Sequence, residues 1–205
     1  MEIIIHGSMK RFKYVSEFLS PKIPFALPIF DDEEAGNIKA YMASFKWLLN
    51  DRLIPGTNTW HLEDDVLPDK RIHEWMRYAE GTEGIICGFG TTEKFGFVEP
   101  EDMWYSFPCI RIPNDYLGDF VQWVETSGDE DVAERMKLGK GIDFLFRKFV
   151  VQNPIQIYHT VPCMVEHIDE YIGGSLINDR KEPIKAIRFE DTERLAELKD
   201  WVKEN

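Results

Sequence analysis

Long apolar runs are missing from this sequence of 205 residues. No run reaches the roughly 18 apolar residues that a membrane-spanning helix needs, and the start, residues 1–6, lacks the basic region of a secretory signal. Cysteine is scarce: Cys87, Cys109 and Cys163 are far apart and show no CxxC spacing, which argues against a disulfide framework and a zinc site. We therefore expect no membrane span and a cytoplasmic location, where thiols stay reduced.

Positive charge is also in short supply. Lysine and arginine number 24 against 37 aspartates and glutamates, for a formal net charge of −13. Such a chain is repelled by nucleic-acid phosphate in general, which argues against an extended DNA or RNA footprint. A local basic segment, Lys10, Arg11 and Lys13, still offers binding to a single phosphate group.

The pattern of apolar residues predicts a single α/β domain, because strands and helices alternate in the first half of the chain. The expected strands cover residues 2–6, 25–30, 60–62, 84–88 and 109–113. The expected helices include one that ends near Leu19 before Pro21, and others over residues 36–50, from 69 onward, 117–126, 142–151 and 191–203. Residues 129–140 form a charged segment without an assigned element, and nothing marks a linker between domains.

The most informative segment covers residues 58–68. Its strand-prone part ends in three consecutive carboxylates, Glu63, Asp64 and Asp65, before a Val-Leu-Pro exit. Adjacent carboxylates at the end of a buried strand repel one another and resist desolvation, unless a divalent cation neutralises them. Oxygen ligands suit Mg²⁺ or Mn²⁺, which commonly bridge to substrate phosphates. An arbitrary acidic triplet is more often a solvated turn, but the apolar residues on both sides favour a metal–diphosphate site.

Two more polar groups follow expected strands. In open parallel sheets, ligands collect beyond the carboxyl ends of the strands, so these groups predict a nucleotide-type pocket. Gly7 would let the backbone approach a ligand closely, Ser8 would donate to a phosphate or ribose oxygen, and Arg11 offers a bidentate fork for phosphate. Asp31 or Asp32 would accept hydrogen bonds from base or ribose, although such pairs are also common in plain turns.

Strand–helix alternation that leads to an acidic triplet resembles the GT-A class of nucleotide-sugar glycosyltransferases, whose hallmark is a DxD-like motif. A second segment, residues 160–178, is similar to the pattern P-S-L-V-x-H-x-G-x-x-S-L near the end of many members. The matching residues are Pro162, Val165, His167, Ser175 and Leu176. Cys163 and Met164 replace the usual Ser and Leu, and the loop before Ser175 is longer.

The resemblance covers residues 1–178 and is greatest to the small stand-alone enzymes of bacteria and their phages. It implies a single-domain GT-A fold, Rossmann-like, with a mostly parallel sheet and helices on both faces. The tail, residues 179–205, would add one amphipathic helix packed on this domain. The implied activity is that of a hexosyltransferase, which moves a sugar from a nucleotide diphosphate sugar, most often a UDP-sugar, to an acceptor hydroxyl.

The acceptor would be a glycan or, for a phage enzyme, a hydroxymethylated DNA base held in a narrow pocket. A phage-encoded enzyme would act in the cytoplasm of its host. The sequence predicts no particular oligomeric state.

In this family the metal would be bound by Asp65, together with Asp64 or Glu63, and His167 would complete the ligand shell. A shell of carboxylates alone suits Mg²⁺, whereas one imidazole favours Mn²⁺. The alternative for His167 is an ordinary histidine that is hydrogen-bonded to backbone.

Family members often carry an acidic residue about 17 positions before the Thr-Val-Pro of residues 160–162. Here this residue is Asp143, which we expect to act as the general base if the enzyme is inverting. In a retaining enzyme no such base is expected, and Asp143 would only position the acceptor. Its alternative role is that of an acid in the first turn of a helix. The cluster Asp129–Asp131 is a competing candidate for the acid on the acceptor side.

Two other functions remain open. A nucleotidyltransferase shares the α/β sheet and the acidic metal site, but is expected to carry a glycine-rich, basic phosphate loop after its first strand. Residues 7–11, Gly-Ser-Met-Lys-Arg, fit that loop only in part. A non-catalytic acidic module that holds a structural cation is the third possibility.

Overall fold

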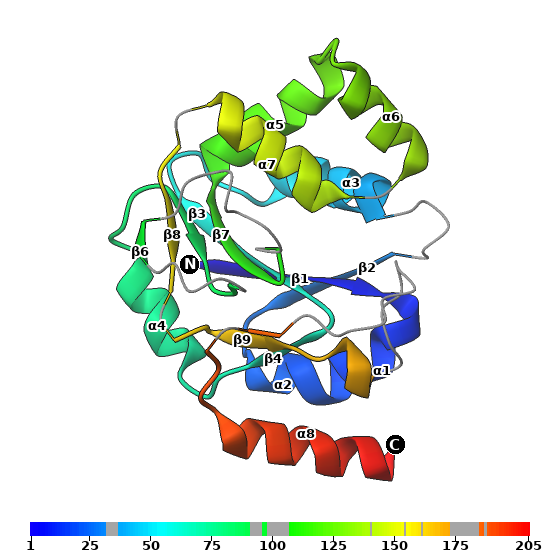
Figure 1. Ribbon diagram of the computed structural model, residues 1–205, viewed down its shortest axis with the longest axis vertical. Coiled ribbons are helices and arrows are strands. Elements are labelled where there is room, and N and C mark those ends of the chain that lie inside the picture. The colour runs from blue at the N-terminus through cyan, green and yellow to red at the C-terminus, as the bar shows by residue number, and fades with distance from the viewer. Residues whose placement is uncertain are drawn as a thin grey trace.

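A computed structural model describes residues 1–31, 37–90, 96–97, 107–139, 141–153, 155–160, 162–172, 185–186 and 188–205. Within these residues the chain forms a seven-stranded sheet and a two-stranded ribbon (Figure 1). Across the sheet the strands are β2 (Leu27–Asp31), β1 (Glu2–Ser8), β3 (Asn58–Glu63), β7 (Cys109–Pro113), β5 (Ile85–Cys87), β8 (Ile157–His159) and β6 (Gly96–Phe97). The ribbon pairs β4 (Val66–Pro68) with β9 (Val165–His167).

The sheet is mixed but mostly parallel. Strand β1 pairs in parallel with β2 and β3, and β5 pairs in parallel with β8. Strand β7 lies antiparallel between β3 and β5, and β6 is antiparallel to β8. The strands β1, β2, β3, β5 and β8 therefore all run in one direction.

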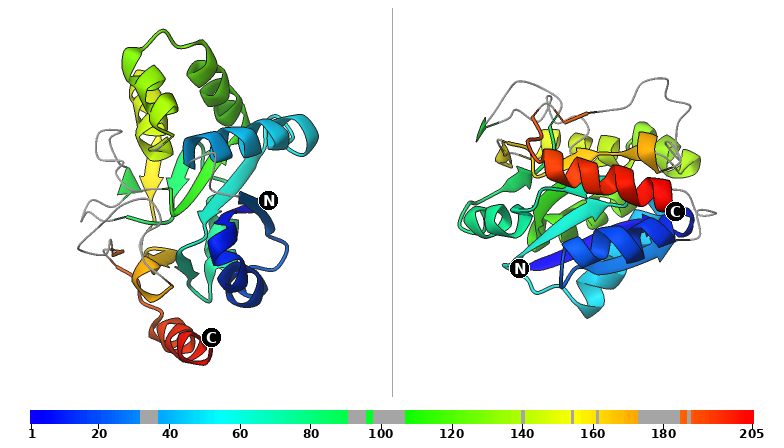
Figure 2. Two further views of the ribbon diagram at one scale, coloured as in Figure 1. Left: turned by 90° about the vertical axis from the view of Figure 1, so that its right-hand side faces the viewer. Right: turned by 90° about the horizontal axis from the view of Figure 1, so that it is seen from below.

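Helices cover both faces of the sheet, as Figure 2 shows. One face carries α3 (Asn37–Asp51), α5 (Asn114–Thr126), α6 (Glu130–Leu138) and α7 (Ile142–Gln152). The other face carries the helical segment of residues 9–22, then α4 (Ile72–Ala79) and α8 (Thr192–Glu204). In β1, Ile4 faces the first layer whereas Ile3 and Ile5 face the second, so this apolar strand is buried on both sides. The predicted single α/β domain with a mostly parallel, Rossmann-like sheet is confirmed.

The first helical segment differs from the prediction. It combines η1 (Met9–Arg11), α1 (Phe12–Tyr14), the π-helical η2 (Val15–Leu19) and α2 (Ser20–Lys22). Pro21 lies inside the last turn and does not end the helix before it.

Helix α6 and the ribbon of β4 and β9 were not among the predicted elements. The charged residues 129–140 include helix α6, whose N-cap is Asp129: its carboxylate accepts hydrogen bonds from the N–H groups of Asp131 and Val132. Val132 is the buried residue of this mostly polar helix, so the helix gave no clear apolar period in the sequence. The ribbon of β4 and β9 was also missed, because its two short strands are nearly 100 positions apart. The candidate site depends on this ribbon, because the pairing places His167 opposite Val66, next to the acidic triplet.

The C-terminal helix α8 matches the predicted residues 191–203 to within one position. Its side chain Leu198 is fully buried, and the ring of Trp201 contacts those of Tyr14 and Phe18. Asp191 caps the helix and also accepts a hydrogen bond from the backbone N–H of Lys70. The division at residue 178 stays a prediction, since residues 173–184 lie outside the described part.

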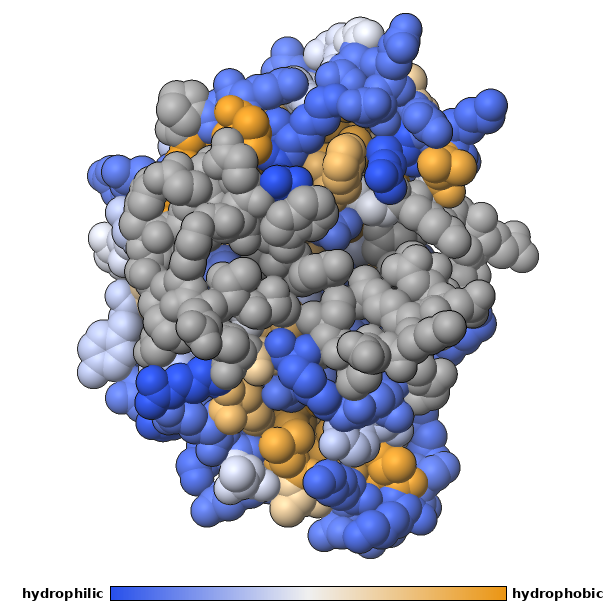
Figure 3. All heavy atoms as spheres, viewed as in Figure 1, coloured by the Kyte–Doolittle hydropathy of each residue, from blue (hydrophilic) through white to orange (hydrophobic). Residues whose placement is uncertain are grey.

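The surface agrees with a chain of strong net charge. Hydrophilic residues predominate over the described part of the face in Figure 3, and apolar residues there form separate groups. Among the helices that the structure describes, none combines the length and the apolar character needed to cross a membrane.

Beneath the acidic triplet, β1 and β3 bury a pair of histidines. His6 Nε2 lies 2.9 Å from His61 Nδ1, and both side chains are almost inaccessible. Burial lowers the pKa of His6 well below its ordinary value, with a further contribution from His61, and it lowers the pKa of His61 to about 3. Both rings are therefore neutral in the folded protein at neutral pH.

This pair predicts a loss of stability in mild acid. The unfolded imidazoles bind protons near pH 6.5 and the folded ones do not, so stability is complete above that pH and falls as the pH drops toward 3. In that pH range, each imidazole lowers the free energy of unfolding by about 1.4 kcal/mol for every pH unit. The test is urea unfolding at about pH 7.5 and at about pH 5. From the higher to the lower pH, the free energy of unfolding should fall by about 2 kcal/mol less in His6→Asn than in the parent protein. His73→Asn, which removes a partly exposed histidine, is the control; equal losses in the parent and His6→Asn would contradict this account.

Candidate metal centre

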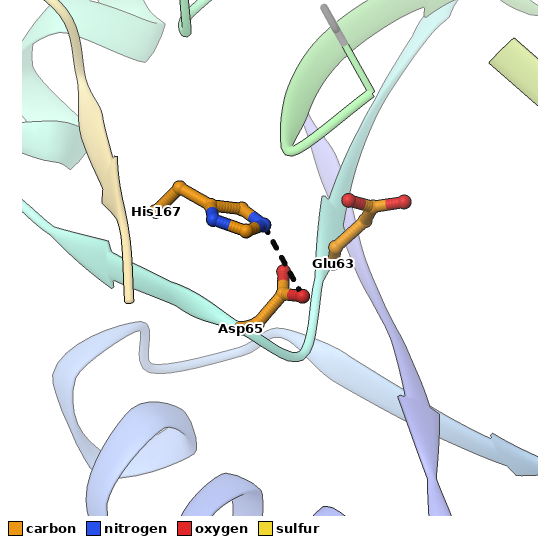
Figure 4. A group of neighbouring side chains, drawn as sticks. All are labelled: Glu63, Asp65 and His167. Atoms are coloured by element: carbon orange, nitrogen blue, oxygen red, sulfur yellow. Dashed lines mark ion pairs between the residues drawn. The ribbon is translucent and has the colours of Figure 1, made fainter. Parts of the chain in front are cut away.

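The ends of β3 and β9 and the turn between β3 and β4 bring three potential metal ligands together. Glu63 is the last residue of β3, Asp65 lies in the turn to β4, and His167 ends β9. One ligand atom from each of these side chains lies within 4.8 Å of the others. Figure 4 shows the three side chains and the ion pair between Asp65 and His167. Two carboxylates and an imidazole thus converge from segments about 100 residues apart.

Asp65 is the central member of this group. Its Oδ2 lies 3.3 Å from His167 Nε2 and accepts a hydrogen bond of 2.8 Å from Arg11 Nη1. Its Oδ1 is buried and has no hydrogen-bond partner among the described residues. A buried carboxylate oxygen without a partner is costly. A divalent cation held by Glu63, Asp65 and His167 fits this arrangement, because it would give the oxygen a partner.

Asp64 forms hydrogen bonds with the end of β1 and the segment after it. Its Oδ2 accepts a hydrogen bond of 2.6 Å from the backbone N–H of Ser8, and its Oδ1 accepts one of 2.7 Å from Arg11 Nη1. This carboxylate therefore joins the end of β3 to the loop after β1, and it is not one of the three converging ligands. Sequence reasoning left Asp64 and Glu63 as equal candidates to assist Asp65; the geometry places Glu63 in the group.

Arg11 is buried, with 5% of the residue exposed. Its Nη1 donates to both Asp64 and Asp65, so its charge faces the acidic triplet. The sequence suggested a phosphate fork at this position. In the structure the guanidinium fixes the carboxylates, and its contact with a phosphate stays a prediction.

Gly7 has a steric role that the sequence did not reveal. A Cβ atom built at this position would lie 3.0 Å from two ring carbons of Phe30 and 3.7 Å from Cβ of Asp64. The missing side chain thus leaves room for the Phe30 ring, and close approach to a ligand stays a prediction.

The other predicted nucleotide contacts lie nearby in part. Ser8 is opposite Asp31 in the register of β1 and β2, so both residues lie at the same edge of the sheet as the acidic triplet. The hydroxyl of Ser8 accepts a hydrogen bond from the N–H of Lys10. Asp32 lies outside the described residues.

The acids of the triplet, Arg11 and His167 shift one another's pKa values. Burial raises the pKa of Glu63 to about 8, with added repulsion from Asp65, and burial raises the pKa of Asp64 to about 6 against the attraction of Arg11. Burial also opposes the charged form of Asp65, but the His167 hydrogen bond and the charges of His167 and Arg11 hold its pKa below the ordinary value. The pKa of His167 is raised, because Asp65 outweighs the effect of burial. Without a cation, the negative charge of the three carboxylates is therefore reduced by bound protons and compensated by the guanidinium of Arg11.

The two candidates for the acid on the acceptor side differ in their surroundings. Asp143 lies in the first turn of α7, and its charge helps to raise the pKa of Glu63. Asp129 caps α6, and both Asp129 and Asp131 bind Lys148 Nζ, at 2.7 and 2.8 Å. The cluster therefore has a structural explanation, whereas the only interaction shown for Asp143 with the candidate metal centre, among the described residues, is the effect of its charge on Glu63.

Sequence reasoning missed two neighbours of the site. The Tyr41 hydroxyl donates to Glu63 Oε1 at 3.3 Å, and Asp169 Oδ1 lies 3.4 Å from His167 Nδ1. The apolar spacing of residues 36–50 predicted Tyr41 as a core residue of a helix, so it did not indicate a polar role for the Tyr41 hydroxyl. Asp169, two positions after a candidate ligand, was the signal that could have been followed.

Comparison with known proteins finds no matching protein-family model and no curated protein with a matching sequence. Among solved structures, the chain is similar to A197 from STIV, with a TM-score of 0.46 and 9% identity, over 82% of this chain and 86% of that one. It is also similar to a putative glucose-1-phosphate thymidylyltransferase from Bacillus anthracis, solved in complex with a sucrose. That similarity has a TM-score of 0.43 and 9% identity, over 77% of this chain and 66% of that one. Likenesses of this size carry no function, which must be argued from the site itself.

The contacts of Arg11 give a prediction on stability. Arg11→Gln leaves the buried Asp64 and the partly buried Asp65 without their cationic partner, which should lower the free energy of unfolding by about 3 kcal/mol. Urea unfolding in the presence of a chelator measures this loss. Lys10→Gln, at the exposed neighbouring position, should leave stability within about 0.5 kcal/mol of the parent value. If both variants were as stable as the parent protein, Arg11 would not hold the triplet.

Proposed function

We propose that the protein is a metal-dependent glycosyltransferase of the GT-A type, which uses a nucleotide diphosphate sugar as its donor. The observation that carries the proposal is the convergence of Glu63, Asp65 and His167 beyond the carboxyl ends of parallel strands. Ligands of open α/β sheets collect at this edge. A donor set of two carboxylates and one imidazole suits Mn²⁺ better than Mg²⁺.

The residues around the group suit a diphosphate. When bound, a divalent cation neutralises the charge of a leaving diphosphate as a Lewis acid. Glu63, Asp65 and His167 would hold this cation, and Arg11 keeps Asp65 in position through its hydrogen bond. Ser8 and Asp31, at the ends of the neighbouring strands, would contact the nucleotide part of the donor.

Asp143 is the proposed general base. It would take the proton of the acceptor hydroxyl while the oxygen forms its bond to the anomeric carbon and the bond to the diphosphate breaks. The proposed acceptor is a glycan or a hydroxymethylated DNA base. A net charge of −13 favours an acceptor that enters a small site over one that needs a large nucleic-acid interface.

Nucleotidyl transfer ranks second. That reaction is expected to use a basic phosphate loop after the first strand, and the arginine at this position faces Asp64 and Asp65. A module that merely holds a structural cation ranks third, and the experiments below separate all three.

Metal and donor binding test the proposal first. Nucleotide diphosphates should raise the melting temperature when Mn²⁺ is present and have little effect in its absence, because ligand bound to the folded state stabilises it by mass action. Asp65→Asn and His167→Ala should weaken Mn²⁺ binding at least about tenfold. Asp119→Asn and His73→Ala are matched controls, at an exposed and a partly exposed position.

Three outcomes are distinct. Hydrolysis of a UDP-sugar that needs metal supports glycosyl transfer. Binding of a nucleoside triphosphate with release of pyrophosphate supports nucleotidyl transfer. Binding of Mn²⁺ without any effect of nucleotides would leave the structural module and contradict the proposal.

Asp143→Asn tests the catalytic step. Loss of a general base should lower kcat about 10²–10⁴-fold, while Mn²⁺ and nucleotide binding stay near the parent values. Asp131→Asn, in the competing cluster, should leave kcat unchanged. A parent-like kcat for Asp143→Asn would mean that this residue does not act as the base.

A further inference from the structure

The imidazole of His167 lies between two carboxylates. Its Nε2 is 3.3 Å from Asp65 Oδ2, on the side of the candidate metal centre. Its Nδ1 is 3.4 Å from Asp169 Oδ1, on the opposite side. Both His167 and Asp169 are buried, with 5% and 4% of each residue exposed. Neither Nδ1 nor Asp169 Oδ1 forms a hydrogen bond within the described part of the chain, and the two atoms lie close enough for a small rotation of either side chain to join them.

The backbone holds these groups in a fixed relation. The N–H of Ile168, between His167 and Asp169, donates to the carbonyl oxygen of Asp65 at 2.8 Å. Asp169 opens the 3₁₀ turn η4 (Asp169–Tyr171), in which the N–H of Ile172 donates to the Asp169 carbonyl. One short segment thus positions the Asp169 carboxylate, the ring of His167 and the carboxylate of Asp65.

The position of one proton decides which nitrogen can bind a cation. A neutral imidazole has one N–H and one lone pair, and its partners determine which nitrogen carries the hydrogen. An acceptor at Nδ1 keeps the proton there and leaves the lone pair on Nε2. In metal sites, histidine ligands usually donate their second N–H to a carboxylate or carbonyl, which fixes the ring and strengthens the ligand.

We propose that Asp169 is a positioning residue for the metal centre. With a cation bound at Nε2, the Asp169 carboxylate, 3.4 Å from Nδ1, would accept the Nδ1–H of His167 and keep the Nε2 lone pair directed toward the cation shared with Glu63 and Asp65. This inference rests on the proposed metal-dependent function and adds a residue that lies outside the group of three ligands. A purely structural Asp169 would stabilise the turn η4 and would have no effect on metal affinity.

Mn²⁺ binding to the full chain, measured by electron paramagnetic resonance, tests the inference. Asp169→Ala should weaken Mn²⁺ binding about 10–100-fold and should reduce the magnetic coupling between bound Mn²⁺ and the imidazole nitrogen. Asp169→Asn keeps an oxygen that can accept the Nδ1–H, so it should recover most of the affinity. Glu170→Ala, which removes the next carboxylate in the same turn, is the matched control and should bind like the parent.

The outcomes separate this inference from the proposed function. If the parent protein binds Mn²⁺, His167→Ala does not, and Asp169→Ala binds like the parent, the positioning role is overturned and the metal centre stands. If Asp169→Ala only lowers the melting temperature and leaves the dissociation constant unchanged, the residue is structural and the inference fails. If the parent protein binds no Mn²⁺, both the proposed function and this inference fail.

Discussion

Three consecutive carboxylates, of which Asp64 is buried and Glu63 and Asp65 are partly buried, meet at the end of β3, and the surrounding structure compensates for their charge. Arg11 contacts two of them, a backbone N–H contacts one, and His167 approaches from a different strand. Burial makes each contact necessary, because an unpaired carboxylate inside a protein is costly. One buried oxygen of Asp65 has no partner among the described residues, and it lies in the group that suits a cation.

The fold brings these charged groups together by pairing strands that are far apart in the sequence. Parallel strands β1, β2 and β3 end at one edge of the sheet, and the ribbon of β4 and β9 brings His167 back to the same place. The site is thus built from four separate stretches of the chain. A change that loosens the ribbon would separate the imidazole from the carboxylates without touching any ligand.

The sequence allowed much of the parallel part to be predicted, since apolar runs such as residues 2–6 and 60–62 are local signals. It also pointed to Asp65 and His167 as partners, through the resemblance to a known segment. The sequence could not show that Arg11 would contact Asp64 and Asp65, because the partner of a charged side chain depends on tertiary contacts. The antiparallel position of β7 was hidden for the same reason: strand order depends on pairing between distant residues and leaves no local pattern.

The most direct test of the central claim is anomalous X-ray diffraction from crystals grown with Mn²⁺. The account predicts one strong anomalous peak within coordination distance of a Glu63 oxygen, an Asp65 oxygen and Nε2 of His167. Absence of a peak there, with these three side chains turned away from one another, would contradict it.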